Sequence, residues 1–279
     1  MKILYNFRFS LALVISLVLM QSNVFAQETK KITGAKGQGI IAGKITPAEA
    51  QREALNQAKV EALRMAGVTE NLQSYQTLFK SEVNNDFSEF FSSDVQAELQ
   101  GAVKEFEVVK EERRADGSVF IFEVTINATV ILYDAKPDPT FNIRVEGVKG
   151  IYEEGENLTF SIFSTKDCYL HIFGITDAYT SLLYPNSIEE LKMIEASKKV
   201  EFPLGNYDYP LFKSTKEPEL TRVVFVFTKE PVKYLNFQKK VDPDGGFEEW
   251  ITNSEDIFSW VYSMMPDMRK LDYQVFTVR

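Results

Sequence analysis

Alanine recurs at every fourth position through one long helical segment, and this repeat constrains the fold more than any other feature. The segment 47–66 follows Thr46, which forms a capping box with Glu49, and Pro47 is its first residue. It ends before Gly67. Positions four apart lie on one face of a helix, so the repeat predicts a smooth ridge that lets the helix lie close against a sheet. The ridge consists of Ala50, Ala54, Ala58, Ala62 and Ala66.

A predicted hairpin supplies that sheet. Ala115-Asp116-Gly117 separates two extended runs, and Asp-Gly between such runs is a strong turn signal. The second run alternates apolar and polar residues, which predicts one buried and one solvated face. We therefore expect a two-layer α+β domain over residues 27–133, with the helix on an antiparallel hairpin sheet. The expected buried positions are Phe120, Phe122, Val124, Ile126, Ala128 and Val130.

Three glycines precede the helix, at Gly37, Gly39 and Gly43. Their GxGxxxG spacing differs from a dinucleotide fingerprint, no apolar strand precedes them, and no helix starts at the last one. The glycines therefore argue against nucleotide binding. They predict a flexible edge strand that bends where glycine tolerates unusual backbone angles.

An amphipathic stretch, residues 72–100, places aromatic and aliphatic residues at four-residue spacing. Phe87 and Phe91, with Phe90 beside them, are candidate binding residues for a protein partner. The alternative is that this aromatic stripe packs on its own domain.

Residues 32–132 resemble the N-terminal domain of the flagellar assembly protein T and related small outer-membrane lipoproteins. The resemblance rests on the glycine-spaced strand GAKGQGIIAG, the alanine-rich helix, the amphipathic stretch ending at Gly101 and the alternating run FEVTINATV. It implies an envelope scaffold or assembly role without a reaction. The chain lacks the lipidation cysteine of the lipoprotein members.

The first residues have the layout of a secretory signal peptide. Lys2 and Arg8 precede an apolar run from Phe9 to Met20, and a small-residue cleavage pattern ends at Ala26. The alternative is an uncleaved anchor, but the run is too short to cross a bilayer stably. We therefore predict cleavage after residue 26, export to the periplasm or outer membrane, and a mature chain without an integral membrane span. The formal net charge of −9 argues against nucleic-acid partners.

The proline-containing segment 134–140 is predicted to be a linker, followed by a β-sandwich domain over residues 141–279. Val223 to Phe227 is apolar on both faces, which is typical of a central strand. A helix beginning at Ser254 and stopped by Pro266, then a last strand, complete the chain. The other expected strands are 141–148, 158–163, 168–175, 181–184 and 199–202.

This half resembles a bacterial domain of unknown function, family 4384, over about residues 141–231. The resemblance rests on the strand Cys168 to Phe173, on the corner Leu183-Tyr184-Pro185-Asn186, and on the later runs KKVEFPL and ELTRVVFVFTKEP. It implies an envelope β-rich module and names neither a ligand nor catalytic residues.

Groups able to perform chemistry are scarce, since the chain has one histidine and one cysteine. His171 is expected to be a packed structural residue and Cys168 a buried small hydrophobe. No metal or cofactor is predicted, and no catalytic residue is assigned. Acidic residues remain candidates for calcium binding or carboxylate-dependent hydrolysis. These are Glu153, Glu154, Glu156, Asp242, Asp244, Glu248 and Glu249.

The loop GNYDYPLFKSTKEP places Tyr207, Tyr209 and Phe212 beside polar groups, so these rings are candidate binding residues for a sugar or a protein. The alternative is that the rings fold back onto the sandwich. We expect a non-enzymatic envelope protein that acts by protein contacts in assembly or scaffolding. A glycan- or peptidoglycan-binding protein is the alternative, and a carboxylate hydrolase is a third hypothesis.

Overall fold

The computed structural model describes residues 28–68, 99–117, 119–205, 207–241 and 248–279. Within them the chain is mostly β-sheet, with helices α2 (Pro47–Ala66) and α5 (Ser254–Tyr262). This confirms the expected β-rich α+β class. The predicted signal segment and the candidate residues Phe87 and Phe91 lie outside the described residues.

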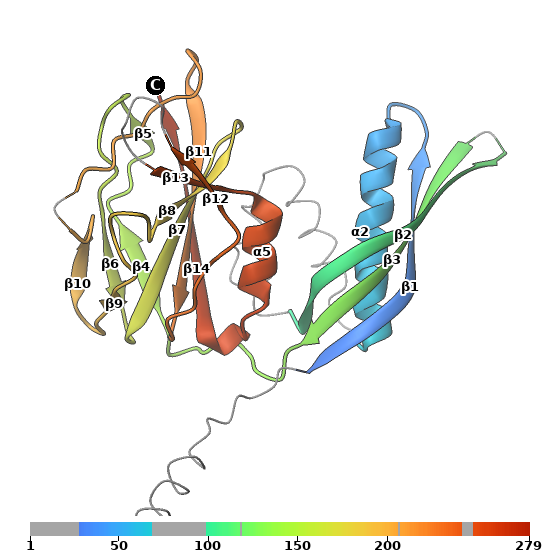
Figure 1. Cartoon of the computed structure of the whole chain (residues 1–279), viewed down its shortest axis with the longest axis horizontal. Coiled ribbons are helices and arrows are strands. Elements are labelled where there is room, and N and C mark those ends of the chain that lie inside the picture. Colours follow the sequence, from blue (N-terminus) through green and yellow to red (C-terminus); the bar gives the residue numbers. More distant parts are fainter. Residues whose placement is uncertain (1–27, 69–98, 118, 206, 242–247) are drawn as a thin grey trace, which may run out of the picture.

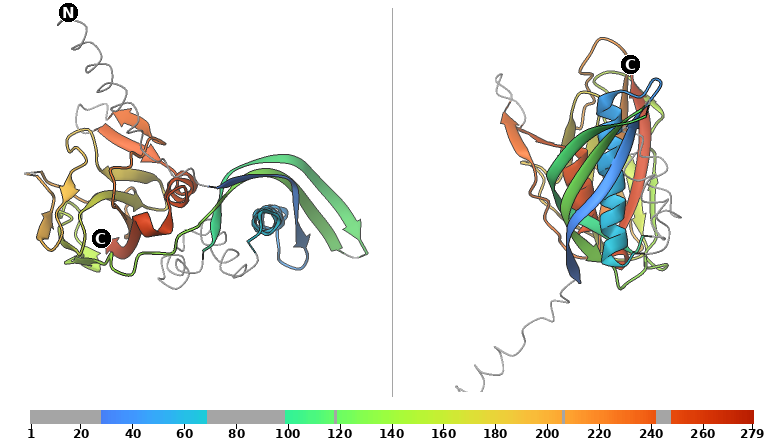
Figure 2. Two further views of the ribbon diagram at one scale, coloured as in Figure 1. Left: turned by 90° about the horizontal axis from the view of Figure 1, so that it is seen from below. Right: turned by 90° about the vertical axis from the view of Figure 1, so that its right-hand side faces the viewer.

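The N-terminal part is a sheet of antiparallel strands with α2 on one face. The strands β1 (Thr29–Ile41), β2 (Gly101–Asp116) and β3 (Val119–Leu132) lie in the order β1-β3-β2. The sheet curves around α2 (Figure 2). The predicted capping box forms, because the Thr46 hydroxyl accepts from the Glu49 N–H at 3.2 Å and the Glu49 carboxylate accepts from the Thr46 N–H at 2.6 Å.

The predicted alanine ridge faces β1 at very short range, and all five of its members are buried. A Cβ on Gly37 would lie 2.0 Å from the Ala54 carbonyl oxygen, and one on Gly39 would lie 1.9 Å from that of Ala50. Glycine is therefore required at these two positions because the strand and the helix approach each other closely. The sequence had predicted bends in the backbone there instead. A positive φ and a register shift occur earlier, at Gly34.

The hairpin β2–β3 turns after Asp116, at the predicted Asp116-Gly117, although Ala115 and Asp116 still pair with Phe120 and Val119 as strand residues. The predicted apolar face of β3 packs under α2 with one exception. Phe120 is 58% exposed, although the alternation predicted burial. It lies next to the turn and pairs with Ile41, the last residue of β1, so it stands at the end of the sheet. Alternation gives the face of a residue but not how far the covering helix extends.

The C-terminal part contains two sheets. One has the order β10-β6-β4, and the other has the order β12-β13-β8-β7-β11-β14-β5 with β9 beside β7 (Figure 1). The strand β11 lies between β7 and β14, so its predicted central position is confirmed. The strands are β4 (Ile143–Glu146), β5 (Ile151–Tyr152), β6 (Phe160–Ser164), β7 (Cys168–Ile175), β8 (Thr180–Tyr184), β9 (Met193–Ile194), β10 (Lys199–Phe202), β11 (Glu219–Thr228), β12 (Gln238–Val241), β13 (Glu248–Thr252) and β14 (Arg269–Val278).

The large sheet buries both of its faces. Leu170, Phe225 and other inward residues share a core with Phe160 and Phe202 of the small sheet. The opposite face is covered by α5, which lies between the large sheet and the N-terminal part (Figure 1). The side chain that caps α5 is that of Asn253, which accepts from the Asp256 N–H at 2.8 Å, so the cap lies one residue before the predicted Ser254.

A short 3-10 turn, η1 (Pro266–Met268), leads from this region into β14. None of the helices described is both long and apolar enough to cross a bilayer.

Candidate functional site

The aromatic loop after β10 is attached to the turn before β6 by backbone hydrogen bonds. Gly155 N–H donates to the Leu211 carbonyl and Leu158 N–H donates to the Tyr209 carbonyl, both at 2.8 Å. Of the predicted binding residues, Tyr207 is 45% exposed and Phe212 is 65% exposed. Tyr209 instead turns inward and packs against Phe202, with 4.8 Å between ring centroids.

The hydroxyl of Tyr209 belongs to a buried polar cluster with Asn186 and Glu189. It donates to Glu189 Oε2 and accepts from Asn186 Nδ2 at 2.7 Å. Burial, followed by the hydrogen bond to Glu189, raises the pKa of the Tyr209 hydroxyl above its usual range. Tyr209 therefore remains a protonated donor at neutral pH.

Glu189 is 3% exposed, and it is held in place by the turn that follows β8. Asn186 Oδ1 accepts from the backbone N–H groups of Ile188 and Glu189 at 2.9 Å, and Asn186 Nδ2 donates to the Leu183 carbonyl at 2.8 Å. Glu189 Oε1 is buried and has no hydrogen-bond donor among the residues that the structure describes. A buried carboxylate oxygen without a donor is costly, which makes this position a candidate binding site.

Glu189 is not among the binding residues that the sequence predicts. The corner Leu183-Tyr184-Pro185-Asn186 was identified as distinctive, and Glu189 follows it by three residues. An Asn whose side chain caps the backbone two and three residues later was the available signal. Nothing in the local pattern indicated that the next carboxylate is buried, because its hydrogen-bond donor Tyr209 lies twenty residues further along the chain.

A second candidate site is a cleft of about 530 Å³ between β2 and α5. Its walls combine apolar rings with charges: Lys59 Nζ lies 4.6 Å from the Phe106 ring centroid and 3.7 Å from Glu255 Oε1. Ser259 Oγ spans the two elements by donating to the Lys104 carbonyl at 2.8 Å. Other lining residues are Val103, Asn236, Asp256, Trp260 and Tyr262.

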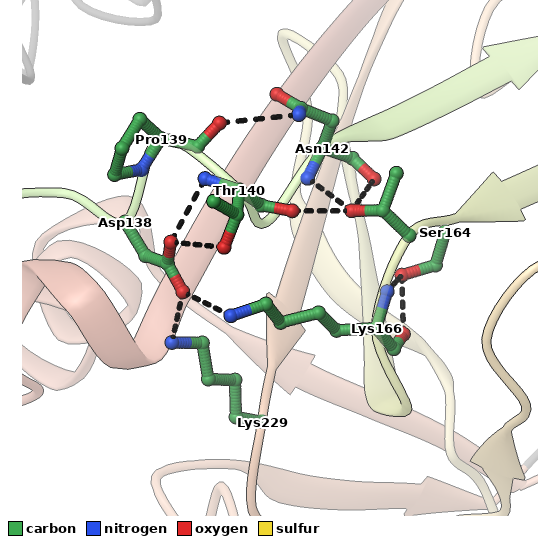
Figure 3. Close-up of polar contacts among 8 residues, drawn as sticks. Asp138, Pro139, Thr140, Asn142, Ser164, Lys166 and Lys229 are labelled. Atoms are coloured by element: carbon green, nitrogen blue, oxygen red, sulfur yellow. Dashed lines mark hydrogen bonds and ion pairs between the residues drawn. The ribbon is translucent and has the colours of Figure 1, made fainter.

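The segment 134–140 is held against the C-terminal sheets through Asp138 (Figure 3). Its Oδ2 accepts from Lys166 and Lys229, each at 2.6 Å, and its Oδ1 accepts from the Thr140 hydroxyl and N–H at 2.7 and 2.8 Å. These donors, Lys166 first, hold the pKa of Asp138 well below its usual range. Asp138 is thus an anchor between segments distant in sequence.

Four of the acidic residues predicted as calcium ligands or catalytic groups pair with separate cations. No group of three or more metal-ligating side chains occurs within the part of the chain that the structure describes. Asp242 and Asp244 fall outside that part. The pairs are Glu153 with Arg279, Glu154 with Lys213, Glu156 with Lys149 and Glu248 with Lys239.

His171 and Cys168 are interior residues, as predicted. Cys168 is fully buried with its thiol free, and burial raises its pKa. His171 is 1% exposed, and its ring lies 4.9 Å from that of Trp260 under α5. Burial lowers the pKa of His171 to about 3, so the ring is neutral at physiological pH.

Comparison with known families finds a match to the family described as Domain of unknown function (DUF4384) over residues 151–231. This match confirms the resemblance predicted for the C-terminal half, and it includes both the corner around Asn186 and the aromatic loop. It does not reach residues 32–132, where the resemblance to the flagellar assembly protein stays a prediction. No curated protein matches the chain.

Proposed function

We propose that this chain is an exported, non-enzymatic protein of a bacterial envelope that holds a protein partner in the cleft between β2 and α5. The supporting observation is the composition of the cleft walls, where Phe106, Trp260 and Tyr262 lie beside Lys59 and Glu255. Aromatic side chains surrounded by polar groups are typical of the centre of a protein interface. A volume of about 530 Å³ accommodates a few side chains of a partner.

The proposal includes a division into a signal peptide, an α+β domain (27–133) and a β-sandwich domain (141–279). In this arrangement the cleft lies where the two domains meet, so both contribute to partner binding. The predicted resemblance of residues 32–132 to envelope assembly proteins agrees with a scaffolding role, and the proposal assigns no reaction to the chain.

Capture from a bacterial envelope extract tests the proposal with three forms of the chain. The unaltered chain should retain a defined protein. Ser259→Trp fills the cleft and should lose that protein, whereas Lys216→Trp adds the same ring on an exposed loop and should keep it. Equal retention by all three forms, or no retained protein, contradicts the proposal.

A glycan-binding role is the second candidate, supported by the exposure of the Tyr207 and Phe212 rings. Flat aromatic faces open to solvent can stack on sugar rings. Cosedimentation with purified peptidoglycan tests this role. It predicts that the chain sediments and that Tyr207→Ala or Phe212→Ala reduces the bound fraction, while Ser259→Trp leaves it unchanged.

A further inference from the structure

The last part of β2 forms an open edge of the N-terminal sheet. β2 lies at the end of the order β1-β3-β2, so among the described residues a strand pairs with only one of its sides. Every residue from 107 to 116 is exposed, and the hairpin reaches the end of the molecule away from the C-terminal sheets (Figure 2). Such an edge presents backbone N–H and C=O groups that can hydrogen-bond to another strand.

A β-bulge and the hairpin turn set the length of this regular edge. The pairing of β2 with β3 shifts its register between Val108 and Lys110 and is then continuous from Lys110 to Asp116, next to the turn. None of the residues 110–116 lines the cleft between β2 and α5. The segment 110–116 is therefore a regular edge that is separate from the proposed partner site.

The side chains on one face of this edge alternate in charge. Residues two apart share a face of a strand. Glu112 pairs with Glu123 of β3, on the face opposite to Phe122 and Val124, which pack under α2. Neighbours along this outer face form ion pairs, at 2.7 Å for the first pair and 3.4 Å for the second. In chain order the outer face carries Lys110, Glu112, Arg114 and Asp116.

We propose that two copies of this chain associate by pairing their β2 edges antiparallel around a two-fold axis at Arg113. The axis of such a pair falls on a residue, because opposed residues point their N–H and C=O groups either toward each other or both away. With the axis at Arg113, Lys110 of one copy lies opposite Asp116 of the other, and Glu112 lies opposite Arg114. Every pair on the outer face then joins opposite charges, which stabilises neighbouring strands.

The charges select this axis over the adjacent ones. An axis at Glu112 would place that residue opposite its own copy and Lys110 opposite Arg114. An axis at Arg114 would place Arg114 opposite its own copy and Glu112 opposite Asp116. Like charges directly opposite each other destabilise a sheet. Charges guard an exposed edge when they repel a second copy, whereas the alternating signs here attract one.

The position of the bulge fits the same axis. With the axis at Arg113, the turn residue Gly117 of one copy lies opposite Val109 of the other, so the paired edge ends at the bulge and short of Lys104, where α5 contacts β2. Because the strands run in opposite directions, the two C-terminal parts lie at opposite ends of the joined sheet. The two Arg113 side chains meet at the axis, and each guanidinium lies 5.0 Å from the centroid of its own Phe122 ring, which holds it against its own sheet.

Sedimentation velocity of the purified chain over a range of concentrations tests the association. We expect a reversible dimer with a dissociation constant of about 10–100 μM, since a short edge with exposed ion pairs forms a weak contact. Raising the salt concentration to about 1 M should weaken the dimer about tenfold, because exposed charges are screened. A chain that stays monomeric at about 0.5 mM overturns the proposal.

Charge-reversal variants identify the surface and the register. Arg114→Glu places carboxylates opposite each other, and Glu112→Arg does the same with cations, so each variant alone should associate at least about tenfold more weakly. An equimolar mixture of the two variants restores opposite charges in every pair and should associate like the unaltered chain. Lys31→Glu is the control, since it reverses an exposed charge on β1, the other edge strand. Unchanged association in both single variants, or no gain on mixing them, overturns the proposal.

A cross-link tests the position of the axis. The chain has one cysteine, Cys168, which is buried, so Arg113→Cys introduces an exposed thiol into a chain whose own thiol is enclosed. Directly opposed residues of an antiparallel pair have Cα atoms about 4.5–5.5 Å apart, within the range that a disulfide spans. Mild oxidation should give a covalent dimer of Arg113→Cys and little of Lys31→Cys. Equal cross-linking of the two, or none in an Arg113→Cys protein whose circular dichroism is unchanged, overturns the proposed axis.

Discussion

Several polar residues in this chain act through partners that lie far away in the sequence. Tyr209 is twenty residues from Glu189, and Asp138 is bound by Lys166 and Lys229 from two different turns. Each of these groups is a common surface residue when considered alone. Their contribution to the folded structure comes from the several hydrogen-bond donors and acceptors that meet at one side chain.

Replacing Tyr209 by Phe tests the buried cluster. The variant removes the donor to Glu189 and the acceptor for Asn186, so we expect a loss of about 1–3 kcal/mol in the free energy of unfolding. Urea denaturation measures it. Tyr207→Phe is the control, because its hydroxyl makes no hydrogen bond to the described residues, and it should change stability little. Equal stability of the two variants contradicts the role assigned to Tyr209.

Asp138→Asn should produce a pH-dependent loss of stability. The pKa of Asp138 is lowered in the folded chain, so its stabilisation is complete above the unfolded pKa of about 4 and is lost as the pH falls toward the folded value. Thermal unfolding should therefore separate the variant from the wild type at pH 7, and the difference should shrink between about pH 4 and pH 2. The exposed Asp134→Asn is the control. A difference independent of pH contradicts the anchor role.

At the scale of elements, the contact between α2 and β1 depends on small residues on both sides. Alanines on the helix and glycines on the strand allow backbone atoms to approach within a distance that excludes any Cβ on Gly37 or Gly39. The strands β3 and β11 follow the usual patterns of burial. Apolar residues alternate with polar ones in β3, and β11 contains a fully apolar run. The helix and β1 therefore constrain each other's sequence.

Gly39→Ala should separate α2 from β1. A methyl group 1.9 Å from the Ala50 carbonyl oxygen meets backbone that cannot move away cheaply, so we expect a loss of about 3 kcal/mol or more. Gly150→Ala is the control, since a Cβ there meets nothing within 4 Å. Urea denaturation followed by circular dichroism compares the two. A Gly39→Ala protein as stable as the control contradicts the close contact.

At the scale of the whole molecule, α5 and Tyr133, the residue just before the linking segment, join the two parts. The Tyr133 hydroxyl donates to the Tyr262 carbonyl at 2.8 Å, and it accepts from Nη2 of the buried Arg269 at 3.5 Å. Burial raises the pKa of Tyr133 to about 12, so its hydroxyl remains a donor at physiological pH. One apolar core extends from α2 through α5 to the large sheet.

Tyr133→Phe should weaken this connection. Loss of the donor to Tyr262 should cost about 1–3 kcal/mol and uncouple the two parts during unfolding. Both tryptophans, Trp250 and Trp260, lie in the C-terminal part, so fluorescence reports that part. The signal at 222 nm includes α2, the longer of the two α-helices among the described residues. The two midpoints should coincide in the wild type and in Tyr179→Phe and should separate in Tyr133→Phe. Coincident midpoints in Tyr133→Phe contradict the coupling.

Local chemistry in the sequence was sufficient to predict several elements. The capping box at Thr46, the stop at Gly67, the Asp116-Gly117 turn and the central run of β11 depend on neighbouring residues, so their signals are contained in short windows. Burial of His171 and Cys168 followed from their positions in an apolar strand.

Only the tertiary structure decided which side chains meet. The hydrogen bond from Tyr209 to Glu189, the ion pairs of Asp138, the exposure of Phe120 and the cleft between β2 and α5 each depend on segments twenty or more residues apart. Contacts of this kind arise when side chains from distant segments pack together and buried polar atoms form hydrogen bonds. No local sequence pattern encodes these contacts. For this reason the sequence indicated an aromatic loop, while the folded chain identified the carboxylate beside it.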